Sequence, residues 1–85
     1  MNELIGKWIA GGYHVYEFFE NGEFQTYALS SPEKKMKGDY EVRGNLVSLR
    51  VYGMSSANVN KFDVEDDTLY LYPPDGGSPI EFKRN

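Results

Sequence analysis

The sequence predicts an all-β protein: an eight-stranded antiparallel up-and-down meander barrel, without any substantial helix. Short apolar runs with a period of two are bounded by Gly, Asn, Pro and Asp, which is the pattern of a β meander. No segment keeps the apolar spacing of three and four that a helix longer than one turn requires. A composition with 15% aromatic residues and 9 glycines is also typical of β-rich proteins. The same meander left partly open, as a flattened roll or sandwich, is the alternative fold.

The length of 85 residues indicates a single domain, 1–85, because one core usually claims about 100–200 residues. No linker, low-complexity tract or long charge block divides the chain. The expected strands are Gly6–Ala10, Tyr13–Phe19, Glu23–Leu29, Met36–Arg43, Leu46–Tyr52, Val59–Glu65, Thr68–Tyr72 and Pro79–Arg84.

Two hairpins can be tested by asking whether their register separates charged from apolar side chains. A two-residue loop at Gly44-Asn45 pairs Asp39 with Arg50 on the outer face and places Tyr40 opposite Leu49 inside. Every charged side chain of this hairpin then points outward, so we expect this register.

The hairpin around Asp66-Asp67 separates its residues in the same way. A two-residue loop there places Val64 opposite Leu69 and Phe62 opposite Leu71, all pointing inward. The acidic side chains of this hairpin then point to solvent.

The first long hairpin requires a different turn. A two-residue loop at Asn21-Gly22 would place Glu17 on the same face as Phe19 and Phe24. A three-residue loop over Glu20–Gly22, with Gly22 left-handed and bulged, shifts the register by one and separates acidic from apolar residues. We therefore expect the bulged turn.

The connections alternate in length, which distinguishes the two ends of the barrel. The tight connections are Glu20-Asn21-Gly22, Gly44-Asn45 and Asp66-Asp67, and the longer ones are 30–35, 53–58 and 73–78. Since alternate loops of a meander lie at the same end, one end is expected to be closed by tight turns and the other rimmed by long loops. Eight strands is also a number at which an antiparallel sheet can close on itself.

The motif Gly6-Lys7-Trp8 in the first strand resembles the Gly-x-Trp motif that opens lipocalins and fatty-acid-binding proteins, the calycin superfamily. In that superfamily a basic residue late in the barrel packs across the tryptophan, and Arg84 is suitably placed to do so. The strands and turns also resemble small microbial lipocalin-like domains. This resemblance implies a lipocalin-like barrel in which Gly6, Trp8 and Arg84 have structural roles.

The registers define an expected interior, which either fills the barrel or leaves room for a ligand. The side chains expected to point inward are Trp8, Tyr16, Phe18, Phe24, Met36, Tyr40, Val42, Val47, Leu49, Val51, Phe62, Val64, Leu69, Leu71, Ile80 and Phe82. Small residues below the long loops favour a ligand site at that open end, because a few polar groups among apolar walls are typical of small-molecule sites. The candidate ligand-binding residues are His14, Tyr16, Met36, Tyr40 and Asn60. His14 and Asn60 have equally simple structural interpretations, as residues bonded to water or to nearby backbone.

The outer face carries several tyrosines. Tyr52, Tyr70 and Tyr72 are expected to point outward and are a candidate interface, because exposed aromatic patches often mark partner surfaces. A homodimer or another protein partner would use this face.

Composition argues against several functions. A net charge of −4 and a pI near 4.8 do not suit nucleic acid or an anionic membrane. Zero cysteines and one histidine exclude cysteine nucleophiles and a self-contained multi-histidine metal centre. The acidic residues from Asp63 to Asp67 lack the spacing of a calcium loop, and no carboxylate or serine has a partner for catalysis. We expect no enzyme, no cofactor and no metal site.

The expected function is therefore a non-catalytic lipocalin-like protein that binds a small, mostly apolar ligand at the open end. The alternative is a solid-core barrel that acts as a protein-interaction or homodimerisation module through its tyrosine-rich outer face. No signal-peptide pattern and no transmembrane run is visible, so a cytoplasmic location is expected. An exported form whose signal has been removed stays open as an alternative.

Overall fold

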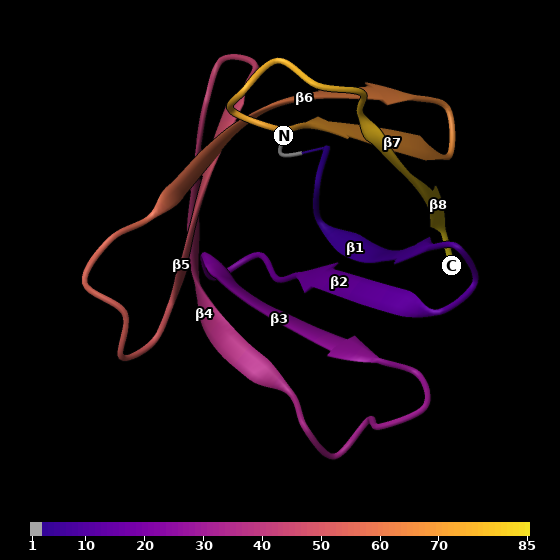
Figure 1. Cartoon of the computed structure of the whole chain (residues 1–85), viewed down its shortest axis with the longest axis vertical. Coiled ribbons are helices and arrows are strands. Elements are labelled where there is room, and N and C mark those ends of the chain that lie inside the picture. Colours follow the sequence, from indigo (N-terminus) through magenta and orange to yellow (C-terminus); the bar gives the residue numbers. More distant parts are fainter. Residues whose placement is uncertain (1–2) are drawn as a thin grey trace.

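The computed structural model describes residues 3–85, and these residues form eight β-strands (Figure 1). The strands are β1 (Gly6–Ala10), β2 (His14–Phe18), β3 (Glu23–Ala28), β4 (Met36–Arg43), β5 (Leu46–Val51), β6 (Asn58–Glu65), β7 (Thr68–Tyr72) and β8 (Ile80–Arg84). They differ from the expected ranges by one residue at some strand ends. No helix among the described residues is long and apolar enough to cross a membrane.

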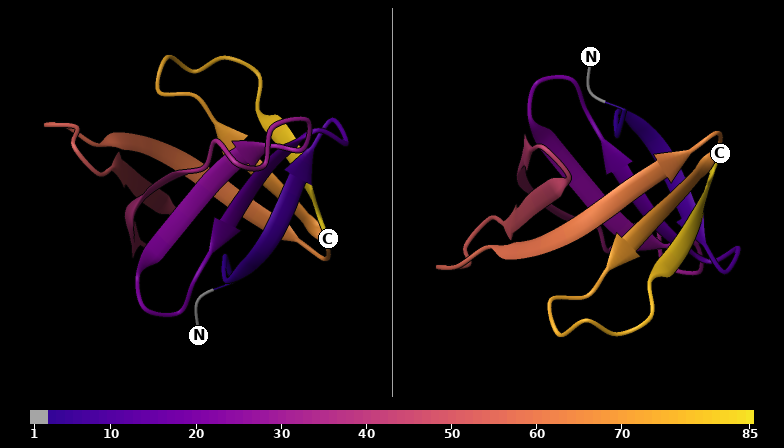
Figure 2. Two further views of the ribbon diagram at one scale, coloured as in Figure 1. Left: turned by 90° about the horizontal axis from the view of Figure 1, so that it is seen from below. Right: turned by 90° about the horizontal axis from the view of Figure 1, so that it is seen from above.

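Each strand pairs antiparallel with the next one in the chain, and β8 returns to pair with β1 (Figure 2). The sheet is therefore a closed meander barrel, as the sequence predicts, and the partly open alternative is wrong. The closing ladder between β1 and β8 is short, because it consists of Trp8 opposite Arg84 and Ile9 opposite Lys83.

The predicted hairpin registers are present. Asp39 pairs with Arg50 and Tyr40 with Leu49 across β4 and β5. Between β6 and β7, Val64 pairs with Leu69 in the same predicted way. These registers place Tyr40, Leu49, Val64 and Leu69 on the inner face, because the side-chain period of a strand is two.

The bulged turn between β2 and β3 is confirmed. Phe18 pairs with Phe24, and the Phe19 amide donates to the Glu23 carbonyl at 2.9 Å. Gly22 has a φ of 89°, which an L side chain rarely adopts. The extra residue keeps Glu17 on the outer face, where its carboxylate accepts a hydrogen bond from Gln25 at 2.9 Å.

The connection between β1 and β2 is a tight turn over Gly11 and Gly12. Both glycines have positive φ, at 62° and 68°, and the Tyr13 amide donates to the Ala10 carbonyl at 3.1 Å. This turn lies at the same end as the long loops. At that end, β1 and β2 are therefore joined by a short turn and not by a long loop.

The interior between the tight turns and the middle of the barrel is filled by aromatic and aliphatic side chains. The buried core cluster consists of Leu4, Trp8, Phe18, Phe24, Val47, Leu49, Leu69, Leu71 and Phe82. Phe18 makes ring contacts with Phe24 at 6.1 Å and with Tyr40 at 4.9 Å between centroids. Aromatic pairs at these separations add to the stability that burial gives.

Burial differs from the expected pattern at three strand positions. Met36 and Ile80 alternate with inward side chains, yet they are 54% and 53% exposed, because they lie at the open end above the filled core. Val15 points outward but has no exposed surface, because Ile9 and Tyr27 flank it on the neighbouring strands.

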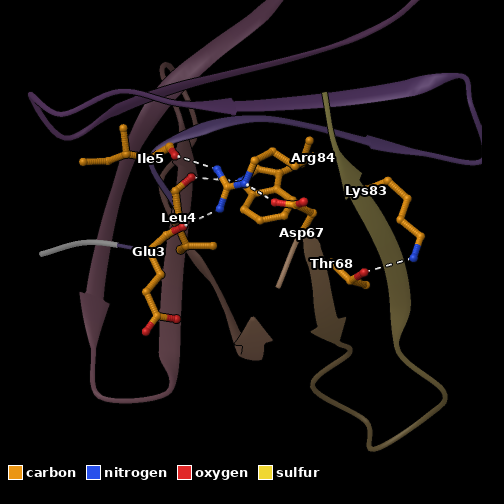
Figure 3. A network of polar contacts seen from close by, with 8 residues as sticks. Glu3, Leu4, Ile5, Asp67, Thr68, Lys83 and Arg84 are labelled. Atoms are coloured by element: carbon orange, nitrogen blue, oxygen red, sulfur yellow. Dashed lines mark hydrogen bonds and ion pairs between the residues drawn. The ribbon is translucent and has the colours of Figure 1, made fainter. Parts of the chain in front are cut away.

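The tight-turn end is covered by the segment before β1. Leu4 is fully buried there, and the Trp8 indole Nε1 donates to its carbonyl at 2.9 Å. The guanidinium of Arg84 lies over the Trp8 ring at 4.1 Å, so the predicted contact is present. Arg84 also donates to the Ile5 carbonyl at 3.2 Å and pairs with Asp67 at 3.4 Å (Figure 3). These contacts join both ends of the described chain at one place.

Candidate functional site

The mouth of the barrel is the end at which the connections 29–35, 52–57 and 73–79 lie. In Figure 2 these connections extend beyond the strands that they join. The inward-pointing residues of this end, by strand register, include Ala10, His14, Ala28, Met36, Val51, Asn58 and Ile80. These residues retain some exposed surface, whereas Thr26, the cross-strand partner of Met36, and Leu71, the partner of Ile80, are buried.

A polar pair lies at the base of the mouth. His14 Nε2 and Thr26 Oγ1 are 3.0 Å apart, on neighbouring strands β2 and β3. The Thr26 side chain is 4% exposed and His14 is half-buried, so this hydrogen bond is partly shielded from water. The imidazole tautomer sets which of the two groups donates, and a ligand that bonds to the second ring nitrogen would select that tautomer.

Tyr16 connects this pair to the aromatic core. Its ring lies 5.3 Å from the His14 ring and 5.3 Å from the Phe82 ring, with an edge-on contact to Phe82. Burial raises the pKa of the Tyr16 phenol above its usual value, and a hydrogen bond with the Thr26 side chain lowers it in part. The phenol is therefore neutral at physiological pH and can serve as a hydrogen-bond group below the mouth.

The apolar wall of the mouth includes two unusually exposed side chains. Met36 and Ile80 point toward the barrel axis but keep more than half of their surface exposed. Met36 pairs with Thr26 across β3 and β4, which places the thioether side chain on the same inner face as the polar pair. Since side chains below this level fill the barrel, a ligand at this site would lie within the mouth and not in a deep cavity.

The structure does not bring Tyr40 to the mouth. Its hydroxyl donates to the Phe19 carbonyl at 2.8 Å, beside the Glu20–Gly22 turn at the opposite end of the barrel. Tyr40 is therefore separated from His14, because the bulged turn and the long loops lie at different ends.

Asn60 lies on the mouth side but uses its amide within the wall. The Nδ2 group donates to the Tyr72 carbonyl at 3.0 Å, at the end of β7. The structural interpretation expected a bond to nearby backbone in the loop beside Asn60, and the structure instead has a bond to the end of the neighbouring strand β7. Thr26, in contrast, was not among the candidate ligand-binding residues, although its inward position beside Tyr16 was expected from the register.

The three candidate interface tyrosines do not form one continuous patch. Tyr70 and Tyr72 share the outer face of β7, and the Lys61 ammonium lies over the Tyr72 ring at 5.8 Å. The residue of β5 in line with Tyr72 is Leu46, so Tyr52 lies six positions further along, roughly 20 Å away. The Tyr52 hydroxyl instead donates to the Glu23 carboxylate at 3.0 Å.

The acidic residues of the β6–β7 hairpin do not assemble a cation site. Within residues 3–85 there is no group of three or more His, Cys, Asp or Glu side chains that could hold a metal ion. Asp67 pairs with Arg84, so this carboxylate is already engaged at the tight-turn end.

Comparison with known proteins adds no relative. No family model, no curated protein and no solved structure matches the chain. The closed antiparallel meander is compatible with a lipocalin-like fold.

Proposed function

We propose that this protein is a non-catalytic binding protein that holds a small, mostly apolar molecule in the mouth of its barrel. The observation that carries the proposal is the exposure of Met36 and Ile80. These side chains point toward the barrel axis, yet each leaves more than half of its surface uncovered. Burying apolar surface of this kind against a ligand is favourable, at about 25 cal/mol per Å².

The polar groups of the mouth set the chemistry of the ligand. The His14–Thr26 pair and the Tyr16 phenol are hydrogen-bonding side chains at the base of the mouth, below the apolar Met36 and Ile80. An apolar body with a single hydrogen-bonding group fits this arrangement, because one directional bond orients a ligand whose affinity comes from burial. Met36 adapts to ligands of different shape because its thioether chain is flexible.

The experiment is a titration of the full chain with the neutral dye Nile red, followed by fluorescence and by backbone chemical shifts. We expect binding with shifts at His14, Tyr16 and Met36. The variant Ala28→Phe fills the mouth and should abolish binding, whereas Leu29→Phe adds the same ring on the outside and should preserve it. Both variants should unfold cooperatively in urea.

Two outcomes of this titration would contradict the proposal. One is binding that Ala28→Phe leaves unchanged. The other is a set of shifts confined to Tyr52, Tyr70 and Tyr72, which would favour the alternative function, a protein contact on the outer face. The half-exposed pair Tyr70 and Tyr72 on one strand is the feature that supports this alternative.

We also propose that the chain is related to the calycin superfamily. The support is the geometry at the tight-turn end, where Gly6, Trp8 and Arg84 form one contact unit that links the first and last strands. Relatives of this chain, aligned over β1 and β8, should keep these three residue types together. Independent variation of the three positions would contradict the relationship.

A further inference from the structure

The outer face of β4, β5 and β6 carries apolar side chains that are nearly half exposed. Leu46 is 43% exposed and Val59 is 49% exposed, and the smaller Ser48 lies beside both. A surface depression of about 260 Å³ is lined by Leu46, Ser48 and Val59 together with Glu41 and Arg43. We call the set Glu41, Arg43, Leu46, Ser48, Val59 and Lys61 the β4–β6 face.

The strand register arranges the β4–β6 face as two rows. One row runs Glu41, Ser48 and Val59 across the three strands. The next row runs Arg43, Leu46 and Lys61. Each strand therefore contributes one residue to each row, and on β4 these two residues have opposite charges.

From this arrangement we infer that the β4–β6 face binds a second copy of this chain. A two-fold axis parallel to the rows, midway between them, places the first row of one copy over the second row of the other. Glu41 then faces Arg43 of the second copy, and Arg43 faces its Glu41. Leu46 faces Ser48 of the second copy and enters the depression above it.

The alternative symmetric arrangement is unfavourable. A two-fold axis parallel to the strands would place Arg43 over Lys61 of the second copy, and like charges facing each other oppose association. It would also place Glu41 over the apolar Val59. The charges of the β4–β6 face therefore select the first arrangement, in which the facing sheets are nearly aligned, as in sheet sandwiches.

The charged pair of this face is well suited to an intermolecular contact. Glu41 and Arg43 are 3.0 Å apart within one chain, but their side chains remain 64% and 80% exposed. A pair this exposed adds little to folding, so its partners can exchange across a two-fold interface at small cost. Lys61 keeps its ammonium beside the Tyr72 ring, and its aliphatic stem can cover Val59 of the second copy.

The size of the face sets the strength of the dimer. The face spans three strands of a curved wall, so the buried area falls below the roughly 1,600 Å² of a standard stable interface. We therefore expect a weak dimer, populated at high protein concentration. This inference is independent of the mouth, which lies at one end of the barrel and not on this wall.

Sedimentation equilibrium of the full chain, from about 0.05 to about 1 mM and at low salt, tests the inference. We expect reversible dimerisation. Leu46→Lys should lower the association constant by about tenfold or more, as substitutions at the centre of an interface do. Glu41→Arg should also lower it, because the new guanidinium would face Arg43 of the second copy.

Two further variants make the test specific. The double variant Glu41→Arg with Arg43→Glu restores opposite charges across the axis and should recover association. The matched control is Glu81→Arg, which makes the same charge change on exposed β8 and should leave association unchanged. A chain that stays monomeric at about 1 mM would overturn the inference. It would equally be overturned if the double variant failed to recover, or if Glu81→Arg weakened association as much as Glu41→Arg.

Discussion

Gly6 shows why a glycine precedes Trp8 in the first strand. Its φ of 133° lies in a region that L side chains rarely adopt. A Cβ at this position would also lie 2.9 Å from Nη1 of Arg84. Because Arg84 is held by the Trp8 ring, the Ile5 carbonyl and Asp67, its guanidinium cannot move away without losing those contacts.

Gly6→Ala is therefore expected to destabilise the fold by about 1–3 kcal/mol, through backbone strain and displacement of Arg84. Urea unfolding followed by tryptophan fluorescence measures the change. Gly53→Ala is the matched control, because Gly53 has a φ of 92° but open space around its Cβ position. If the two variants lost equal stability, Arg84 would not be the reason for the glycine.

Trp8→Ala is expected to cost about 3–5 kcal/mol, the usual effect of removing a buried large aromatic side chain. Trp8 is fully buried, its indole donates to Leu4, and Arg84 covers its ring. Thermal unfolding followed by circular dichroism checks the loss. Tyr13→Ala, at a 54% exposed position, should change the midpoint little. An unchanged midpoint for the tryptophan variant would refute its role at the tight-turn end.

At the scale of strands and turns, the registers of the β2–β3, β4–β5 and β6–β7 hairpins were predictable because charged and apolar residues alternate in them. Glu17 could be kept outside only by the three-residue turn, and the structure contains that turn. How much of a side chain is exposed was less predictable than the face of the sheet to which it points. Val15 points outward yet is buried by its cross-strand neighbours, while Met36 and Ile80 point inward yet are exposed. Alternation identifies the face of a side chain, but neighbouring side chains decide how much water reaches it.

The two-residue turns of the barrel differ in one backbone position. Gly44 opens the β4–β5 turn with a φ of 62°, and Asp66 opens the β6–β7 turn with a φ of 55°. A left-handed conformation costs an L residue about 1–2 kcal/mol, so Asp66 is strained where Gly44 is not.

Asp66→Gly is expected to stabilise the fold by up to about 1 kcal/mol, because relief of strain exceeds the added entropy of the unfolded chain. The reciprocal variant Gly44→Asp should destabilise it by a similar amount. Urea midpoints of both variants, compared with the parent chain, provide the measurement. Destabilisation by Asp66→Gly would mean that the Asp66 side chain contributes more than its backbone strain costs.

At the scale of the whole molecule, burial of Tyr16 makes the folding stability of the barrel depend on pH. Its pKa is raised above 10.0, so the folded state favours the neutral phenol more than the unfolded state does. This contribution to stability is fully present when the pH is below the pKa of the Tyr16 phenol in the unfolded chain. It is lost as the pH rises through the pKa of the phenol in the folded chain. Stability should therefore fall in alkaline solution.

Tyr16→Phe should reduce this alkaline loss, because no phenol remains to ionise. Urea midpoints at about pH 8 and about pH 11 would show a smaller difference for Tyr16→Phe than for the parent chain. Tyr13→Phe, at an exposed position, should leave the difference unchanged. An identical alkaline loss in Tyr16→Phe and the parent chain would contradict the assignment.

The candidate site was predictable only where it depends on local pairing. His14 and Met36 follow from strand direction and loop length, and both lie at the mouth. Tyr40 was assigned to the wrong end: its backbone amide donates to the Gly22 carbonyl at 2.9 Å and its hydroxyl to the Phe19 carbonyl, both at the bulged turn. The tyrosine patch failed for a related reason: in a tilted, sheared barrel, residues on one outer face can lie far apart along the strands.

The closing ladder between β1 and β8 has a consequence for folding during synthesis on the ribosome. Arg84 contacts Ile5 across 79 positions of sequence, and the Trp8–Arg84 pair belongs to the same short ladder. A ribosome that has released β1 to β7 therefore exposes a sheet with two unpaired edges, and edges of this kind pair readily with other chains. Closure must wait until residue 84 has emerged, so the edges of β1 and β7 stay open to pairing with other chains until then.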